Sequence, residues 1–198
     1  MKHFGIFLLI TFLGRDLFAQ RYFNDKYSLK TEQSTVRDSA LKELLITCEG
    51  TSGPRVFLET LSGKLIKSLE KSKVAATYIY TGSESSESSQ RTEEALSGHG
   101  ADAVLKFEQA DESGNPIKVS QSAGLSLLMG GVVISRTTTL NQTFAVTLTS
   151  ADAAKKIYWK GILKVNFDLS KSKLYNDLVK MVMAELYGVN CFSEKPGK

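Results

Sequence analysis

Hydrophobic and polar residues alternate through two adjacent stretches in the second half of the chain. In residues 142–149 the apolar side chains fall on every second position, and residues 157–167 repeat the pattern after a short polar break. A period of two predicts a β-hairpin with one apolar face, whose loop is residues 150–156. Gly161 lies inside the second strand, where we expect a bulge or a close backbone contact. The apolar face of this hairpin needs other elements to cover it.

Apolar residues at helical spacing predict two long helices. The first follows Pro54, a residue suited to the first turn of a helix, and carries leucines three or four residues apart as far as Leu69. The second begins near the capping residues Ser170 and Ser172 and ends at Gly188. Each helix has one broad apolar face to bury.

Short apolar runs predict the remaining strands. They occupy residues 44–48, 74–80 and 103–107, and a shorter strand is expected at 117–119 after the turn signal of 111–116. A strand, a helix and a strand in succession predict a parallel pair with a right-handed crossover. The sequence therefore predicts an α/β (α+β) fold, a mixed sheet of about five strands with two long helices packed on one face.

Polar segments surround and interrupt these elements. Residues 20–43 mix aromatic and charged side chains and predict an extended N-terminal arm. Residues 82–90 are rich in serine and glutamate and predict a solvated loop, which a turn or two of helix follows at 91–96. We expect a single domain over residues 44–192 and a polar tail at 193–198.

Residues 1–19 have the composition of a secretory signal peptide. Lys2 precedes the apolar run 4–13, and Ala19 supplies a small residue before the expected cleavage ahead of Gln20. The run is too short to span about 30 Å of hydrocarbon as a helix. We expect an exported protein of the periplasm or outer envelope, with an uncleaved N-terminal anchor as the alternative.

Two cysteines, Cys48 and Cys191, remain after this cleavage. In an oxidising compartment an even pair predicts one disulfide, which would join an early strand to the end of the chain. The alternative is two buried free thiols.

Composition limits the classes of partner. Hydrophobic residues make up 42% of the chain and charged residues 23%, values of an ordinary globular protein. The net charge of +4 comes from 25 basic and 21 acidic residues that are mixed along the sequence. Nucleic-acid binding usually requires clustered lysine and arginine, so we expect no nucleic-acid partner.

Residues for catalysis or metal binding are sparse. His99 is the single histidine after the expected cleavage site, and with Asp102 it forms the one candidate general base. A histidine between two glycines is also an ordinary loop residue. The cysteines are far apart, and the sequence has no carboxylate loop of the calcium-binding kind. We expect no catalytic set, no metal and no cofactor.

A loop of small residues leads from the first strand into the first helix, where backbone N–H groups can bind an anion. The candidates are Gly50, Thr51, Ser52 and Gly53. The loop lacks the ending of a phosphate-binding loop, and the following proline removes one donor. A plain helix-entry turn is the alternative.

Two further stretches are candidates for contact with other molecules. Residues 120–140 are apolar and contain glycine, so they either pack on their own sheet or form a flap that touches a membrane or a partner. The flap candidates are Leu125, Leu127, Leu128, Met129, Val132 and Val133. In the strand 157–167, Tyr158, Lys160 and Lys164 lie on the parity opposite to the core and are candidates for partner contact, although exposed lysines also protect edge strands.

The order of elements, a strand introduced by residues 100–105 and the hairpin sequence KKIYWKG at 155–161 resemble uncharacterised periplasmic lipoprotein domains of unknown function. More distantly they are similar to the N-terminal domain of TolB and to the curli-secretion lipoproteins. The resemblance covers about residues 44–189, but the lipid-attachment cysteine of such lipoproteins is missing. It implies a non-catalytic role in assembly or partner binding and offers no catalytic residues.

Three functional hypotheses follow. The first is an exported, non-catalytic binding or assembly module of the cell envelope, with an envelope protein as its partner. The second is a membrane-associated or pore-forming component that uses residues 120–140. The third is a hydrolase with His99 as its base.

Overall fold

The computed structural model describes residues 22–24, 26–51, 53–82, 85–116 and 139–192. The expected signal peptide, the strand at 117–119, the flap candidates of segment 120–140 and the polar tail lie outside the described residues.

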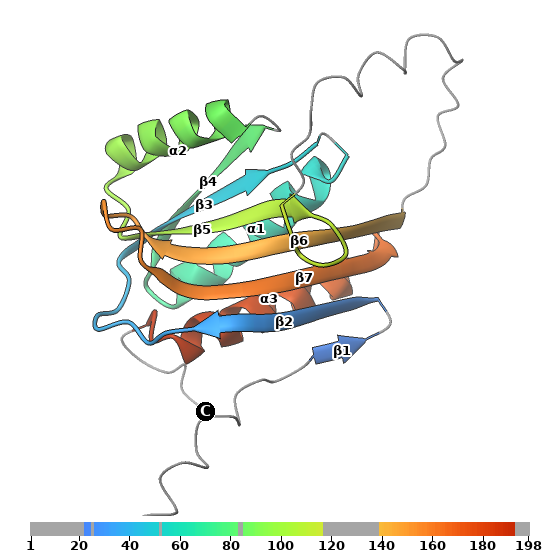
Figure 1. Cartoon of the computed structure of the whole chain (residues 1–198). Coiled ribbons are helices and arrows are strands. Elements are labelled where there is room, and N and C mark those ends of the chain that lie inside the picture. Colours follow the sequence, from blue (N-terminus) through green and yellow to red (C-terminus); the bar gives the residue numbers. More distant parts are fainter. Residues whose placement is uncertain (1–21, 25, 52, 83–84, 117–138, 193–198) are drawn as a thin grey trace, which may run out of the picture.

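The described chain forms one mixed sheet and three helices (Figure 1). The sheet order is β1-β2-β7-β6-β5-β3-β4; β3 is parallel to β4 and β5, and every other pair is antiparallel. The strands are β1 (Tyr22–Asn24), β2 (Tyr27–Ser34), β3 (Glu43–Glu49), β4 (Ala75–Gly82), β5 (Ala103–Ala110), β6 (Thr139–Ser150) and β7 (Ile157–Asp168). The helices are α1 (Arg55–Lys71), α2 (Ser85–His99) and α3 (Ser172–Gly188).

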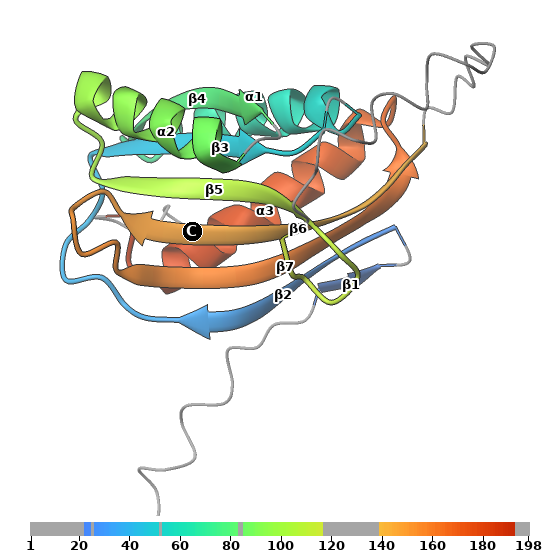
Figure 2. The same ribbon diagram turned by 45° about the horizontal axis from the view of Figure 1, so that its top comes forward.

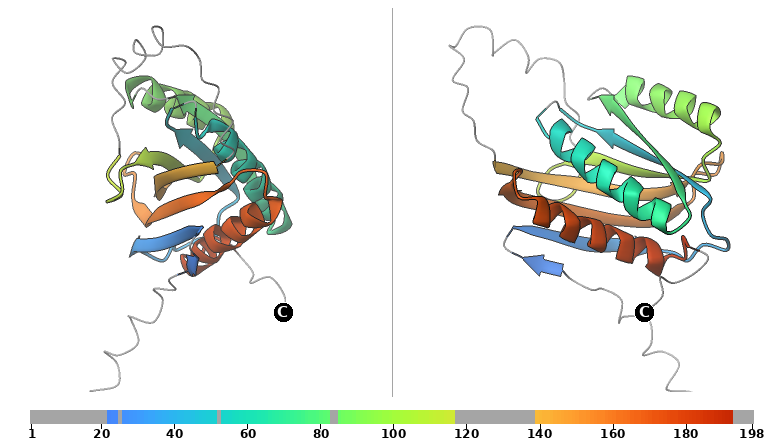
Figure 3. Two further views of the ribbon diagram at one scale, coloured as in Figure 1. Left: turned by 90° about the vertical axis from the view of Figure 1, so that its right-hand side faces the viewer. Right: turned by 180° about the vertical axis from the view of Figure 1, so that it is seen from behind.

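The helices lie on both faces of the sheet (Figures 2 and 3). Helices α1 and α3 cover what we call the first face, where the main core lies. Helix α2 covers the second face only over β3, β4 and β5, through a small cluster of Leu45, Ala95 and Val104. The predicted α+β class and the two long helices on one face are confirmed, and the sheet has seven strands where about five were expected.

Alternation along the strands decides which side chains enter the main core. Phe144, Val146 and Leu148 of β6 are fully buried on the first face, as the hairpin pattern predicts. Trp159 of β7 is also fully buried, and its indole N–H donates a hydrogen bond to Thr31 Oγ1 at 3.1 Å. The polar N–H of this buried tryptophan therefore has its hydrogen-bond partner on a neighbouring strand, and the ring is part of the core and not of a ligand site.

The prediction of an extended arm is wrong for residues 27–34, which form β2 and pair with β7. Tyr27, Leu29 and Thr31 alternate with polar neighbours, and Leu29 is 1% exposed. Leu29 is the one aliphatic residue on the buried side of this strand, and a single residue is too weak a pattern to predict a strand.

The prediction of a solvated loop at 82–90 is also wrong, because α2 begins at Ser85. Its contact with the sheet comes from its second half, where Ala95 is buried and Leu96 is half-buried against the small cluster. A hydrogen bond from Gln90 Nε2 to Glu94 Oε1 at 2.9 Å, one turn apart, supports the exposed side of the helix.

Two glycines permit close packing within the sheet. A Cβ at Gly161 would lie 3.0 Å from the Lys30 carbonyl oxygen and 3.0 Å from Trp159 Cζ2, which confirms the predicted close backbone contact. Gly114 has a φ of +88°, and a Cβ there would overlap Ile162, with Cγ1 at 2.7 Å. The turn at 111–116 thus folds over the second face and covers Ile162.

We expect Gly114→Ala to lower the free energy of unfolding by about 1–3 kcal/mol, because it combines a left-handed φ with a clash in a packed region. Urea unfolding followed by circular dichroism measures the change. Gly98→Ala is the matched control, since a Cβ there meets nothing within 4 Å and alanine favours a helix. Equal stability of the two variants would contradict the packing of this turn on Ile162.

Candidate functional site

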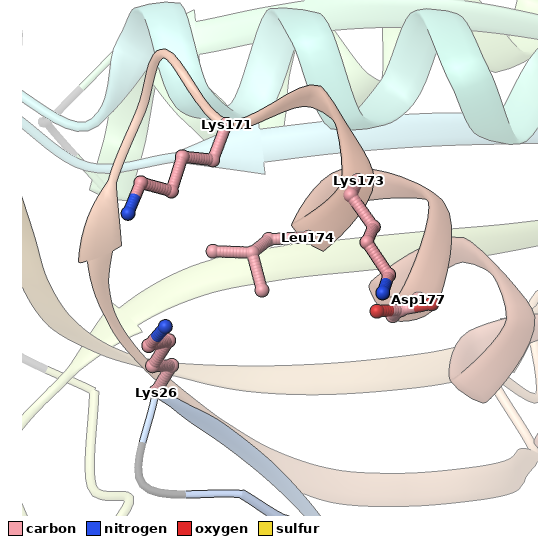
Figure 4. Close-up of a pocket in the computed structure, with 5 residues that line it drawn as sticks. All are labelled: Lys26, Lys171, Lys173, Leu174 and Asp177. Atoms are coloured by element: carbon pink, nitrogen blue, oxygen red, sulfur yellow. The ribbon is translucent and has the colours of Figure 1, made fainter.

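A pocket lined by lysines lies at the end of the sheet where β2 and α3 begin (Figure 4). Its volume is about 260 Å³, and five side chains surround it. They are Lys26, Lys171, Lys173, Leu174 and Asp177. Because they come from two distant parts of the sequence, the pocket exists only in the folded chain.

Hydrogen bonds of the backbone fix the two segments that carry these side chains. The N–H of Asn166 on β7 donates to the Lys26 carbonyl oxygen at 2.6 Å. After β7 ends, Asp168 accepts the N–H of Ser170 at its Oδ1 and the N–H of Lys171 at its carbonyl oxygen. This turn brings the start of α3 beside the start of β2.

Lysines outnumber acidic residues in the lining of the pocket. Asp177 is the one acidic residue of the lining, and its Oδ2 already accepts a hydrogen bond from the Tyr27 hydroxyl at 3.3 Å. Helix α3 has no acidic residue in its first turn and no side-chain cap, so its positive end adds to the charge of the lysines. The arrangement suits an anionic group such as a carboxylate or a phosphate.

A second depression of about 370 Å³ adjoins the first and shares Lys26 with it. Polar side chains of β2, β6 and β7 line it, together with Glu112 of the turn that follows β5. The other lining residues are Tyr27, Ser28, Asn141, Gln142, Thr143, Lys164, Val165 and Asn166. This end of the sheet therefore offers a continuous polar surface.

The segment that contains residues 120–140 is attached at the same end. Pro116 forms a bridge with Ala110 at the end of β5, and Thr139 at the start of β6 pairs with Asp168 at the end of β7. Both described ends of the segment thus lie at the end of the sheet where β5 and β7 end.

No protein-family model matches the sequence, and no curated protein matches it either. Among solved structures, the chain is similar to two PelC dodecamers from Paraburkholderia phytofirmans. One, a Leu-to-Met variant, has a TM-score of 0.44 and 10% identity over 81% of this chain and 98% of that chain. The other has a TM-score of 0.43 and 11% identity over 80% and 96%. At these values the likeness carries no argument about function or assembly.

The structure separates the three residues predicted to contact a partner. A register shift between β6 and β7 lies beside Tyr158, which packs against the main core under the Arg37 guanidinium, with Cζ 4.3 Å from the ring centroid. Lys160 forms an ion pair with Glu32 at 3.0 Å on the second face. Lys164 alone reaches the candidate site, where it lines the second depression. Tyr158 therefore lies apart from the two lysines, and contact of the three residues with a partner stays a prediction.

The sequence analysis missed Lys26, Lys171 and Lys173. A signal was present, since residues 171–173 read KSK at a helix start that has no acidic residue. That pattern opposes the usual preference for negative charge at a helix N-terminus. The contribution of Lys26 could not be foreseen, because it depends on the pairing of β2 with β7.

The loop proposed for anion binding is a helix-entry turn in the structure. The N–H of Gly50 donates to the Gly82 carbonyl oxygen at 2.9 Å, and the N–H and hydroxyl of Thr51 both donate to Gln109 Oε1 at 3.1 Å. Gly53 is exposed, and Ser52 lies outside the described residues. Because two of its N–H donors are already bonded, the loop does not form the predicted anion site.

His99 and Asp102 do not act together in the structure. His99 is exposed at the end of α2. Asp102 Oδ2 accepts the backbone N–H groups of Lys42 at 2.7 Å and Glu43 at 3.0 Å. Partial burial disfavours the carboxylate, but these bonds outweigh it and lower the pKa of Asp102. This aspartate fixes the loop before β3 and is not positioned to orient an imidazole.

Searches for a metal site and a membrane helix gave no candidate in the described chain. Among the residues that the structure describes, no three His, Cys, Asp or Glu side chains are grouped to hold a metal ion. None of the described helices combines the length and the apolar character needed to cross a membrane.

The predicted disulfide is wrong, because Cys48 and Cys191 are free and lie at opposite ends of β3. Cys48 Sγ lies 3.7 Å from Ser62 Oγ near the end of the strand, whereas the Cys191 carbonyl oxygen accepts the N–H of Leu41 before its start. The five steps from Glu43 to Cys48 alone span about 16 Å. A disulfide needs Cα atoms within about 7 Å.

Burial raises the pKa of the Cys48 thiol to about 12, and burial also raises the pKa of Cys191 to about 12. We therefore expect neither thiol to react with iodoacetamide at pH 8 in the folded protein and both to react in denaturant, since the thiolate is the nucleophile. Intact-mass analysis counts the added groups. A protein two hydrogens lighter without reductant than with it would contradict the free thiols.

Proposed function

We propose that the protein is an exported, non-catalytic module of the cell envelope that binds an anionic group of a protein partner at the lysine-lined end of its sheet. One observation carries the proposal: Lys26, Lys171 and Lys173 converge on a pocket whose single carboxylate already accepts a hydrogen bond from Tyr27. Export is inferred from the signal-like composition of residues 1–19.

Lysines gathered in this way attract an anion, and the positive end of α3 adds to that attraction. Because the lysines are exposed, they attract an anion from solution, and added salt screens this attraction. A partner with exposed aspartate or glutamate side chains would be attracted to this end of the sheet and oriented there.

The chemistry of the lining favours binding over catalysis. The residues around the two depressions supply mainly ammonium groups, amides and hydroxyls, with the carboxylates of Asp177 and Glu112, and they include no histidine or cysteine. Ser28 and Thr143 in the second depression have no histidine nearby to act as base, because His99 lies at the end of α2, over the part of the sheet formed by β3, β4 and β5. A lining dominated by hydrogen-bond donors suits recognition.

A membrane-associated role is the second candidate, and one observation favours it. The apolar segment 120–140 leaves and re-enters the described chain at the lysine-lined end. Apolar residues beside lysines are typical of surfaces that attach to anionic lipid. The same lysines would then face lipid headgroups instead of an acidic protein.

Reversing the charge of the pocket tests the proposal. We expect Lys171→Glu with Lys173→Glu to reduce the partner recovered by crosslinking in the native cells at least tenfold, since the change removes two attractive charges and adds two repulsive ones. The matched control is Lys42→Glu with Lys67→Glu, which alters two exposed lysines away from the pocket. Circular dichroism confirms that both variants fold.

Equal recovery with both double variants would overturn the proposed site. Sedimentation with vesicles separates the two candidates. Binding to vesicles of anionic phospholipid, lost in the Lys171→Glu, Lys173→Glu variant and absent with neutral vesicles, would favour the membrane role over the protein partner.

A further inference from the structure

The outer edge of β4 is a strand edge without charged residues, and no bulge interrupts it from Ala75 to Tyr80. β4 is the last strand of the sheet, opposite β1 (Figure 1), and no described strand pairs with its outer side. Its sequence, AATYIYTG, contains no charged residue and no proline. Both faces of β4 are covered, because Tyr78 and Tyr80 pack on the main core and Ile79 packs on the cluster under α2. The exposed part of these residues is therefore the outer side of the strand.

The opposite side of the sheet shows the protection that β4 lacks. There β1 covers only the beginning of β2, and the rest of β2 carries the exposed charges Lys30 and Glu32. A register shift between Thr31 and Gln33 further disturbs this edge. Charges and bulges of this kind prevent strands from pairing with other chains. β4 has its own register shift after Tyr80, but its stretch from Ala75 to Tyr80 carries neither a charge nor a bulge, which indicates that this part of the edge is used.

Backbone alternation shows which groups β4 presents to its outer side. The N–H of Ala75 donates to the Lys42 carbonyl oxygen on the side of β3. Successive peptide groups point to opposite sides of a strand, so those of Ala76, Tyr78 and Tyr80 point outward. Arg91 Nη1 donates to the Thr81 carbonyl oxygen at 3.3 Å, which places α2 at the end of this stretch.

We propose that β4 pairs with β4 of a second copy of this chain in antiparallel orientation, with the twofold axis at Tyr78. The three outward residues are symmetric about Tyr78, so Ala76 of each copy faces Tyr80 of the other and Tyr78 faces itself. Hydrogen-bonded pairs of this kind exchange two bonds each, which gives about six bonds across the interface. The sheet then continues through both copies.

The side chains of β4 complement one another in this register. On the first face the small Ala76 lies opposite the large Tyr80, so the two rings have room. On the second face Thr77 lies opposite Ile79, and β-branched residues form favourable cross-strand pairs. A shift by one residue would place the side chains of the two copies on opposite faces, so the register is specified.

Helix α1 supports the same arrangement. It lies over β4, and the twofold axis places α1 of the second copy beside it in antiparallel orientation. Arg55 near the start of the helix pairs with Glu59 at 2.7 Å in its own chain, and its guanidinium lies over the Tyr80 ring. In the dimer it comes beside the part of the second helix that carries Glu70. Gly63, in the middle of α1, is exposed, and a Cβ there would meet nothing within 4 Å. A glycine inside a helix costs about 1 kcal/mol relative to alanine, and a closely approaching second helix gives a reason for it.

The mass of the purified protein in solution tests the proposal. We expect a dimer by analytical ultracentrifugation and at least a tenfold weaker association for Thr77→Lys, which puts two charges into the interface. Ala76→Pro is a second variant, since it removes an outward N–H and leaves the bonds to β3 in place. Gln33→Lys adds the same charge to the exposed edge of β2 and is the matched control, with an unchanged mass.

Cysteine crosslinking tests the register. Thr77→Cys with Ile79→Cys should give a covalent dimer on oxidation, because each new thiol faces its counterpart in the second copy. Ala75→Cys with Ile79→Cys is the control and should stay uncrosslinked, since these positions do not face each other in the proposed register. The native thiols are buried and do not compete.

A monomer at all concentrations would overturn the proposal, as would a dimer that Thr77→Lys and Ala76→Pro leave intact in folded protein. A monomer that instead binds an extended peptide of another protein along β4 would also overturn it and assign the edge to a foreign strand. Loss of the dimer with partner recovery unchanged would leave the lysine-lined pocket untouched, so this test is independent of the proposed function.

Discussion

The contact of Phe57 with two aromatic rings holds the layers of this protein together. Phe57 on α1 stacks on Phe144 of β6 with ring centroids 5.5 Å apart and packs against Tyr175 of α3 at 5.6 Å. One fully buried side chain therefore joins both helices of the first face to the central hairpin. Because the helices are fixed to the sheet in this way, the start of α3 has a defined position beside β2. The lysine-lined pocket depends on that position.

Two surfaces with different chemical properties lie at different borders of the sheet. The end of the sheet at which β5 and β7 end carries positive charge and the attachment points of segment 120–140. The outer edge of β4 carries uncharged backbone and side chains. A pocket of lysines attracts an anion at long range, whereas a strand edge binds at short range through hydrogen bonds. A chain with both surfaces can join copies of itself without blocking the pocket.

Several predictions that were based on local sequence failed because contacts elsewhere in the fold decided the structure. The Ser-rich stretch before Gln90 has little to bury, yet α2 forms because Ala95 and Leu96 reach the sheet at its other end. Tyr158 was assigned to the exposed parity, but a register shift in the hairpin turned it toward the core. The disulfide was inferred from an even number of cysteines, and the position of Cys48 and Cys191 at opposite ends of β3 excludes it. Each failure involves a contact that counting residues along the chain does not reveal.

The sequence by itself determined the elements with strong periodicity. The hairpin of β6 and β7, the strands β3, β4 and β5, both long helices, the mixed α+β class and the close contact at Gly161 follow from spacing, since one-sided burial imposes a period of two or of 3.6. The tertiary structure alone decided the order of the strands, the addition of β2 and the meeting of Lys26 with Lys171 and Lys173. Lys26 lies more than 140 residues from Lys171 and Lys173, and β2 pairs with residues of β7 that are 125 to 138 positions away. Pairing over such distances leaves no local pattern in the sequence.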